Sequence, residues 1–285
     1  MEINNVTVIG AGTMGAGIAQ VSALVGCNTV LFDIADAPIE KGLAGIRKSL
    51  QKGVDRDKVT PEDRDAALSR ITTSTDLATA VASADLVVEA VPEDLELKRK
   101  IFRDVEAAAP AHAILATNTS SLPISDVAEA VNTPARMVGM HFFNPVPIMK
   151  LLEIVVGKAT SDETRDAVVA FGERLSKEVI TVKDAPGFAS SRLGICIAME
   201  AIRMVEQGVA SAEDIDRAMV FGYGHPMGPL RLTDLVGLDV RMAIAEHLAE
   251  ALDAPAFQPP ETLRKLVAEG KLGKKSGHGF YGWED

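Results

Sequence analysis

Two residues of this sequence, a histidine and a glutamate twelve positions apart, have the types needed for proton transfer. His141 lies in the apolar run MVGMHFF (137–143), and Glu153 interrupts the apolar run LLEIVV (151–156). A carboxylate within an apolar strand is costly to bury without a partner, and His141 is the obvious candidate. An imidazole that a carboxylate orients and makes more basic can remove the proton of a hydroxyl group. The alternative is a structural histidine, hydrogen-bonded at the edge of a sheet.

A glycine-rich turn near the N-terminus has the spacing of a dinucleotide-binding site. Gly10, Gly12 and Gly15 form the pattern G-x-G-x-x-G, directly after a β-branched run and at the start of a helical pattern. Gly10 allows the tight turn, Gly12 lets the backbone approach a pyrophosphate, and Gly15 lets helix and strand pack closely. The phosphates would lie on N–H groups at the positive end of the helix. The residues that we assign to this turn are Gly10, Ala11, Gly12, Thr13, Met14 and Gly15.

A carboxylate at the end of the second expected strand makes the cofactor prediction more specific. Asp33 follows the run NTVLF, 18 positions after Gly15, where it can accept hydrogen bonds from ribose hydroxyls. A 2′-phosphate would meet a like charge there with no basic neighbour, so the sequence predicts NAD and not NADP. A tight turn without a cofactor is the alternative. With His141 as the base, the nicotinamide would take hydride from an alcohol, and the two motifs together predict an alcohol-oxidising enzyme.

The other histidines and both cysteines give no sign of a metal site. Four histidines lack the spacing of metal ligands, and we expect structural or surface roles for them. They are His112, His225, His247 and His278. Cys27 and Cys196 are far apart in sequence and lie in apolar surroundings, so we predict two ordinary buried thiols and no disulfide.

The elements that would position these residues alternate between short β-branched runs and longer helical patterns, up to about residue 181. Apolar residues recur at helical spacing in 94–109 and in 161–178, the second of which starts with acidic residues that a helix N-terminus favours. This alternation predicts an α/β domain over residues 1–183, with a doubly wound, mostly parallel Rossmann-type sheet. The runs expected to form strands are 6–10, 28–34, 85–91, 113–117, 137–143 and 151–156.

Residues 184–285 are predicted to form a smaller, all-helical domain for substrate binding and dimerisation. Extended β-branched runs disappear there, and 190–208 reads as one long helix that Gly208 is placed to end. This helix carries too much apolar surface for a solvent-facing helix. Its apolar residues include Leu193, Ile195, Ile197, Met199, Ile202 and Val205. We expect them to be buried against neighbouring helices or a second subunit, and we predict a homodimer.

Composition narrows the classes of partner. The 285 residues include 40 acidic and 29 basic side chains, and the net charge of -11 disfavours nucleic acid as a partner. No apolar run is long enough to span a membrane, and no basic-then-apolar leader precedes the first strand pattern. We therefore predict a cytosolic protein that binds neither nucleic acid nor membranes.

Several longer motifs are similar to those of a known family. On these motifs the sequence resembles the short-chain L-3-hydroxyacyl-CoA dehydrogenases, especially the bacterial 3-hydroxybutyryl-CoA dehydrogenases, over nearly the whole chain. The motifs are VIGAGTMGAGIA (8–19), VVEAVPEDLELK (87–98), TNTSSLPI (117–124), GMHFFNPVPIMKLLEIV (139–155), DAPGF (184–188), EQGVASAEDID (206–216), GYGHPMGPLRLTDLVGLD (222–239) and KKSGHGFY (274–281). The resemblance implies reversible, NAD-dependent oxidation of a short-chain (S)-3-hydroxyacyl-CoA at C3, a reaction of fatty acid and butanoate metabolism.

The resemblance also implies roles for individual side chains. His141 would be the general base with Glu153 as its partner, and Ser120 would hydrogen-bond the 3-oxygen of the substrate. The residues implied at the cofactor are Glu93, Lys98, Asn118 and, from the helical domain, Lys275. Without the family, Ser120 would instead cap a helix that begins near Leu122, and Lys98 would be a solvated helix lysine.

Two parts of the substrate site match the family less closely. Many members have Asn in the pattern PGF-x-x-N-R, where this chain has Ser191, a shorter side chain without the amide, so its substrate contact must differ. The segment where the family contacts CoA carries hydroxyl and basic side chains that suit phosphates. They are Ser49, Lys52, Arg56 and Lys58. A solvated helix face is the alternative there.

Two other functions stay open at this point. An NAD-dependent dehydrogenase of a free hydroxy acid or a sugar acid would use the same histidine and glutamate. A non-catalytic NAD-binding protein would have no need for His141, Glu153 and Ser120 together, which argues against it.

Overall fold

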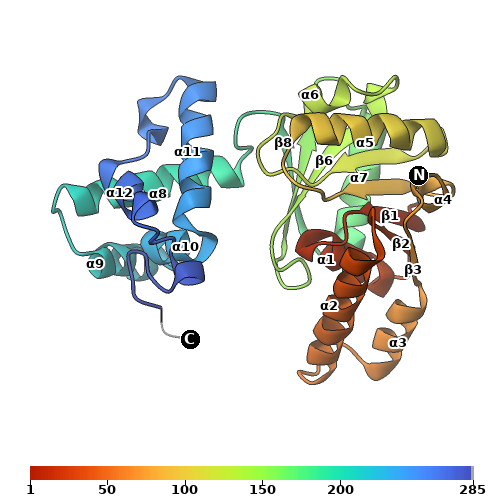
Figure 1. Cartoon of the computed structure of the whole chain (residues 1–285), viewed down its shortest axis with the longest axis horizontal. Coiled ribbons are helices and arrows are strands. Elements are labelled where there is room, and N and C mark those ends of the chain that lie inside the picture. Colours follow the sequence, from red (N-terminus) through yellow and green to blue (C-terminus); the bar gives the residue numbers. More distant parts are fainter. Residues whose placement is uncertain (284–285) are drawn as a thin grey trace. The chain divides into compact units, whose positions relative to one another are not determined.

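The computed structural model describes residues 1–283, in two compact units that Figure 1 shows with most of their elements labelled. The first unit spans Met1–Ala185 and the second starts at Pro186, two residues beyond the boundary expected from the sequence. Within residues 1–283, no helix is both long enough and apolar enough to cross a membrane.

The first unit is built on one eight-stranded sheet with the strand order β3-β2-β1-β4-β5-β6-β7-β8. The strands are β1 (Asn5–Ile9), β2 (Asn28–Phe32), β3 (Ile71–Ser74), β4 (Leu86–Glu89), β5 (Ile114–Thr117), β6 (Met137–Phe142), β7 (Leu151–Val156) and β8 (Glu178–Lys183). Strands β1 to β6 are parallel, β7 runs antiparallel to β6, and β8 is parallel to β7. The order runs outward from β1 in both directions, so the predicted doubly wound, mostly parallel sheet is confirmed.

Helices cover both faces of this sheet, and each face has its own hydrophobic core. The helices of this unit are α1 (Thr13–Leu24), α2 (Asp36–Val54), α3 (Pro61–Ser69), α4 (Leu77–Val81), α5 (Leu95–Ala108), α6 (Ile124–Ala128) and α7 (Asp162–Arg174). Successive strand residues point to opposite faces, so Val8 packs with Ile18 of α1 and Phe171 of α7, whereas Ile9 packs with Phe102 of α5. Because both faces of the sheet are buried, its strands are held in place. The strand ends, which carry the polar residues of the candidate site, are therefore held in place as well.

The region after α7 differs from the sequence expectation. The predicted helix over 161–178 is wrong at its end, because α7 stops at Arg174 and Glu178 already opens β8. Ser176 adopts a positive φ of 58°, which ends the helix, and the β-branched residues that follow pair with β7 instead. The short strand β3 was not expected either.

The second unit is helical through the residues that the structure describes. Its α-helices are α8 (Ser190–Glu206), α9 (Ala212–Arg217), α10 (Pro229–Val236), α11 (Leu238–Leu252) and α12 (Glu261–Ala268). Ile195 and Ile202 of α8 are fully buried in its core, and Gly208 with φ +68° follows the end of this helix as predicted. Leu193 and Ile197 of the same helix remain 64% and 37% exposed.

The two cysteines differ in environment. Cys27 is buried in the first unit, and this burial raises the pKa of its thiol. Cys196 lies on α8 and is exposed, so the prediction of a buried thiol is wrong there. On α8, Ile195 faces the core and is buried, whereas the next residue, Cys196, lies on a different face of the helix and is exposed.

Candidate active site

The pairing of β6 with β7 places His141 directly opposite Glu153. Nδ1 of His141 lies 2.7 Å from Oε2 of Glu153, and the two side chains are 7% and 0% exposed. Because the carboxylate accepts the hydrogen bond of Nδ1–H, Nε2 is the ring nitrogen that can take up a proton. The ring of Phe143 packs against the imidazole, with 4.4 Å between the ring centroids. The buried carboxylate therefore fixes the orientation of the imidazole ring, as a histidine that acts as a base would require.

A second polar cluster surrounds Glu93, between β4 and α5. Its Oε1 accepts hydrogen bonds from the Thr119 hydroxyl at 2.6 Å and from the backbone N–H groups of Ser120 and Ser121 at 2.9 and 3.0 Å. Burial alone would raise the pKa of the Glu93 carboxyl, but the charge of Lys98 and these hydrogen bonds outweigh it and hold this pKa below its ordinary value. An ionised Glu93 therefore shapes the turn that carries Ser120.

Lys98 on α5 is fully buried, so its interpretation as a solvated helix lysine is wrong. Its ammonium donates to Oε1 of Glu89 at 2.7 Å and lies 3.3 Å from Oε2 of Glu93. Glu89, which the sequence analysis missed, is also fully buried. Its two carboxylate oxygens accept hydrogen bonds from the backbone N–H of Val91 and from the Thr117 hydroxyl, each at 2.7 Å. Through the hydroxyl of Thr117, the Glu89–Lys98 ion pair contacts the end of β5, where the next turn begins.

The segment after β5 has further fixed points. Asn118, predicted at the cofactor, accepts a hydrogen bond through Oδ1 from the backbone N–H of Phe142 at 2.9 Å, which joins the segment to β6 beside the histidine. Helix α6 is capped by the carboxylate of Asp184, which accepts hydrogen bonds from the backbone N–H groups of the first two helical residues. The interpretation of Ser120 as a helix cap is therefore wrong.

The glycine turn between β1 and α1 suits a dinucleotide. Gly10 has φ +100°, and a Cβ on Gly15 would lie 1.7 Å from the Gly10 carbonyl oxygen, so the turn excludes side chains at both positions. A Cβ on Gly12 would meet no atom within 4 Å, which leaves the backbone there open to a ligand. Gly12 is also the N-cap of α1, whose start has no side-chain cap and no acidic residue. The first N–H groups of α1 therefore suit a pyrophosphate.

Asp33 follows β2 directly and lies next to this turn. Its Oδ2 accepts a hydrogen bond from the backbone N–H of Ala11, and its Oδ1 from that of Ile34, each at 2.8 Å. Asp33 is half-buried, and each carboxylate oxygen has a second lone-pair site. The carboxylate is thus fixed in position and still able to accept hydrogen bonds from ribose hydroxyls.

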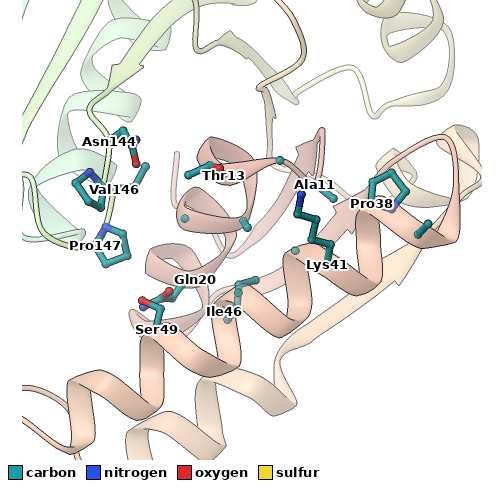
Figure 2. Close-up of a pocket in the computed structure, with 17 residues that line it drawn as sticks. Ala11, Thr13, Gln20, Pro38, Lys41, Ile46, Ser49, Asn144, Val146 and Pro147 are labelled. Carbon is teal, nitrogen blue, oxygen red and sulfur yellow. The ribbon is translucent and has the colours of Figure 1, made fainter. Parts of the chain in front are cut away.

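A cleft of about 690 Å³ lies within the first unit, between α1, α2 and the turn 144–147 (Figure 2). Of the lining residues in the described part of the chain, only Lys41 is charged, and in Figure 2 it extends from α2 toward the glycine turn. Ser49, predicted to contact CoA, also lines the cleft, whereas Lys52 and Arg56 do not and are exposed. Sequence reasoning missed Lys41, although it lies two helical turns before Ser49 on the same helix.

The last predicted site residues belong to the second unit. Ser191 is the second residue of α8 and is partly buried. The ammonium of Lys275 lies 2.5 and 2.7 Å from the carboxylate oxygens of Asp239, near the start of α11. Roles for these two residues at the substrate and the cofactor stay predictions. Within residues 1–283, no group of three or more His, Cys, Asp or Glu side chains is placed to hold a metal ion.

Comparisons with known proteins cover the whole chain. Models of the 3-hydroxyacyl-CoA dehydrogenase NAD-binding domain and C-terminal domain match residues 5–185 and 187–283. The chain is 44% identical to the probable 3-hydroxybutyryl-CoA dehydrogenase of Bacillus subtilis, over 100% of this chain and 99% of that protein. It is 47% identical to the human mitochondrial hydroxyacyl-coenzyme A dehydrogenase, over 98% of this chain and 91% of that protein. The crystal structure of (S)-3-hydroxybutyryl-CoA dehydrogenase from Ralstonia eutropha superposes with a TM-score of 0.96, at 42% identity and full coverage of both chains.

Proposed function

The chain belongs to the 3-hydroxyacyl-CoA dehydrogenase family, and we propose that its substrate is a short-chain (S)-3-hydroxyacyl-CoA, above all 3-hydroxybutyryl-CoA. It is an NAD-dependent oxidoreductase of 3-hydroxyacyl-CoA. The buried, hydrogen-bonded pair of His141 and Glu153 carries the proposed mechanism. The short acyl chain is supported by the 3-hydroxybutyryl-CoA dehydrogenases of Bacillus subtilis and Ralstonia eutropha, to which this chain is similar over its full length.

His141 acts as the general base in this proposal. With Nδ1–H held by Glu153, Nε2 accepts the proton of the 3-hydroxyl group, and the buried carboxylate stabilises the imidazolium that forms. NAD, when bound, accepts the hydride from C3. In the reverse direction the protonated His141 returns its proton to the oxygen of the ketone.

Ser120 supplies a hydrogen bond to the same oxygen. Its backbone N–H is bound to Glu93 at 2.9 Å, whereas its hydroxyl lies at a long 3.4 Å from the same carboxylate oxygen. The hydroxyl can therefore rotate toward the substrate while the backbone stays in place. A base and a hydrogen-bond donor at one oxygen are what the interconversion of alcohol and ketone requires.

The glycine turn and Asp33 hold the cofactor. The N–H groups at the start of α1 bind the pyrophosphate, and the carboxylate of Asp33 accepts hydrogen bonds from the ribose of the adenosine half. The negative charge of Asp33 disfavours a 2′-phosphate at this place, which supports NAD over NADP.

The part of the cleft along α2 takes the CoA part of the substrate, whereas Ala11, Gly12 and Thr13 at its other side belong to the dinucleotide turn. Its mainly small and apolar lining suits the pantetheine arm, and Lys41 and Ser49 are placed to bind phosphate oxygens. Lys52 and Arg56 lie further along the same segment and add positive charge there.

The second unit forms the interface of a homodimer. Leu193 and Ile197 are large apolar side chains exposed on one helix, as expected for a surface that a second subunit covers. Ser191 on the same helix contacts the substrate, and Lys275 contacts the cofactor. A cytosolic location remains a prediction, since the similar proteins include both a bacterial enzyme and mitochondrial ones.

The proposal is tested by NADH oxidation with acetoacetyl-CoA. We expect turnover to be faster with acetoacetyl-CoA than with longer 3-oxoacyl-CoAs, and faster with NADH than with NADPH. In H141A, kcat should fall by about three orders of magnitude while the Kd of NADH changes by less than about twofold. A diketoreductase of dicarbonyl compounds, 31% identical with a TM-score of 0.87, supports a CoA-free substrate as the second candidate. Faster turnover of free acetoacetate than of its CoA ester would refute the acyl-CoA proposal in favour of that candidate.

A further inference from the structure

We infer that Glu89 is a positioning residue for catalysis, which acts through Lys98 and Glu93 on the turn that presents Ser120. The inference rests on the proposed role of Ser120 at the substrate oxygen. Glu89 is the last residue of β4 and is fully buried, so it acts through its neighbours.

The first step of this connection is the ion pair itself. Oε1 of Glu89 accepts hydrogen bonds from the Lys98 ammonium and from the backbone N–H of Val91, each at 2.7 Å. Its Oε2 accepts a hydrogen bond from the Thr117 hydroxyl at 2.7 Å. The carboxylate therefore joins three elements at one point, namely β4, α5 and the end of β5.

The second step leads from Lys98 to the turn. The Lys98 ammonium lies 3.3 Å from Oε2 of Glu93, whose Oε1 accepts hydrogen bonds from the Thr119 hydroxyl and from the N–H groups of Ser120 and Ser121. Glu93 thus has one oxygen toward the buried cation and the other toward the turn. A shift of the ammonium would move the carboxylate and the backbone that it binds.

The third step concerns the segment 117–121, which is held by hydrogen bonds at both ends. Thr117 at its start is bound to Glu89, and Ser120 near its end is bound to Glu93, so one row of three charges anchors both ends. Between them, Asn118 is bound to the backbone N–H of Phe142, the neighbour of His141. The row of charges therefore sets the position of the Ser120 hydroxyl relative to the base.

Stability alone gives no reason for this row of charges. A buried ion pair loses its hydration on folding, and well-packed apolar side chains in its place are often as stable or more stable. Buried charges at fixed positions instead give the groups that are hydrogen-bonded to them a defined geometry. Here those groups are the hydroxyl and N–H donors of the catalytic turn.

A direct contact of Lys98 with the cofactor is the competing role. Its side chain is 0% exposed, and its ammonium is within 3.5 Å of Glu89, Glu93 and the carbonyl oxygen of Val91. An ammonium so engaged acts on the turn, and the cofactor contact of Lys98 that the resemblance implies stays a prediction. The two roles predict different kinetic effects, on kcat or on the affinity for NADH.

The double variant E89Q/K98M tests the inference. K98M alone would leave the fully buried Glu89 carboxylate without its cation, whereas the double variant removes both fully buried charges at nearly constant volume and leaves Glu93, whose side chain is 34% exposed, with its hydrogen bonds to the turn. K100M, which removes an exposed lysine of the same helix, is the matched control. The thermal unfolding midpoint of the double variant should stay within about 5 °C of the unmodified chain.

We expect the double variant to lose turnover even when NADH is saturating. Under that condition its kcat for acetoacetyl-CoA should fall at least about tenfold. Amide hydrogen exchange at Ser120 and Ser121 should become at least about tenfold faster, because their N–H groups lose a firmly held acceptor. The further change S120A should cost less in the double variant than in the unmodified chain, since both act through one hydroxyl.

The pH profile in the direction of ketone reduction gives a second readout. There the active form needs a protonated His141 and an ionised Glu93, so protonation of Glu93 limits the rate on the acid side. The Lys98 charge helps to keep the pKa of Glu93 low, so its removal should raise this pKa and move the acid limb to higher pH. K100M should leave this limb in place.

The inference is overturned if the double variant keeps the kcat and the acid limb of the unmodified chain, or if it loses NADH affinity and keeps kcat. Failure of the unmodified chain to reduce acetoacetyl-CoA would instead refute the proposed function. Amide exchange at Ser120 is measured without substrate, so unchanged exchange would overturn the inference independently of activity.

Discussion

Replacing Glu153 by glutamine removes the charge beside the base and keeps the shape of the side chain. Glu153 is 0% exposed and its Oε2 lies 2.7 Å from Nδ1 of His141, so bulk solvent screens its charge only weakly. The glutamine oxygen can still accept the hydrogen bond of Nδ1–H. E153Q therefore isolates the electrostatic part of the pair from its orienting part.

The size of the effect follows from the geometry. The centres of the two charges are about 4 Å apart when the imidazole is protonated, and an effective dielectric constant of about 20 gives an attraction of about 4 kcal/mol. Full loss of this attraction in the transition state would lower kcat by about 10³. With the proton only half transferred, about 2 kcal/mol is lost, and kcat falls about 30-fold. We expect a decrease between these two values.

The assay is steady-state oxidation of (S)-3-hydroxybutyryl-CoA by NAD, the direction in which the imidazolium forms, with the Kd of NADH measured separately by fluorescence. We expect a lower kcat, a Kd within about twofold, and an unchanged far-UV spectrum. E178Q, which neutralises an exposed glutamate at the start of β8, is the control and should leave kcat unchanged. A folded E153Q with kcat within about threefold of the unmodified chain would refute the electrostatic role of Glu153.

Three further predictions concern the cofactor turn and the cleft. D33S/I34R should shift the preference from NADH toward NADPH, because a cation replaces the repelling carboxylate; unchanged ratios of kcat/KM would contradict our account of ribose recognition. G15A should weaken NADH binding by at least about tenfold in a fluorescence titration, because its Cβ would lie 1.7 Å from the Gly10 carbonyl oxygen and must displace the turn. K41M should raise the KM of acetoacetyl-CoA about fivefold to tenfold, as expected for one charge-assisted phosphate contact, whereas the exposed K48M on the same helix should not.

Apolar runs in the sequence predicted the strands around the site. These runs do not show whether neighbouring strands are parallel or antiparallel. β6 ends at Phe142 and β7 starts at Leu151, so eight residues connect them. A parallel crossover needs a dozen residues or more, so the length of this connection already indicates an antiparallel pair. β8 was missed for another reason. The helical spacing of 161–178 continues across the true helix end, which depends on the left-handed conformation of Ser176.

The buried charges of the site had sequence signals that were not used. Glu89 interrupts the apolar run LVVEAV in the same way as Glu153 interrupts LLEIVV. Lys98 lies on the apolar face of its helix, three residues after Leu95 and four before Phe102. A charge at a core position of a helix and another at the end of a neighbouring strand together indicate a buried ion pair. The hydrogen bonds of the turn 117–121 follow from its folded path and have no such signal.

Buried carboxylates in this chain have different hydrogen-bond partners. These partners distinguish a carboxylate with a structural role from one with a proposed role in catalysis. Asp234 of the second unit is 0% exposed and accepts hydrogen bonds from the N–H groups of Phe280 and Tyr281 and from the indole of Trp283. These donors do not titrate near neutral pH, so the carboxylate of Asp234 has a structural role, which is to hold residues 280–283 in place. Glu153 is bonded to the imidazole of His141, the proposed base, so in the proposed mechanism its charge is coupled to proton transfer. The partner of a buried carboxylate, more than its burial, therefore identifies the residue at which chemistry takes place.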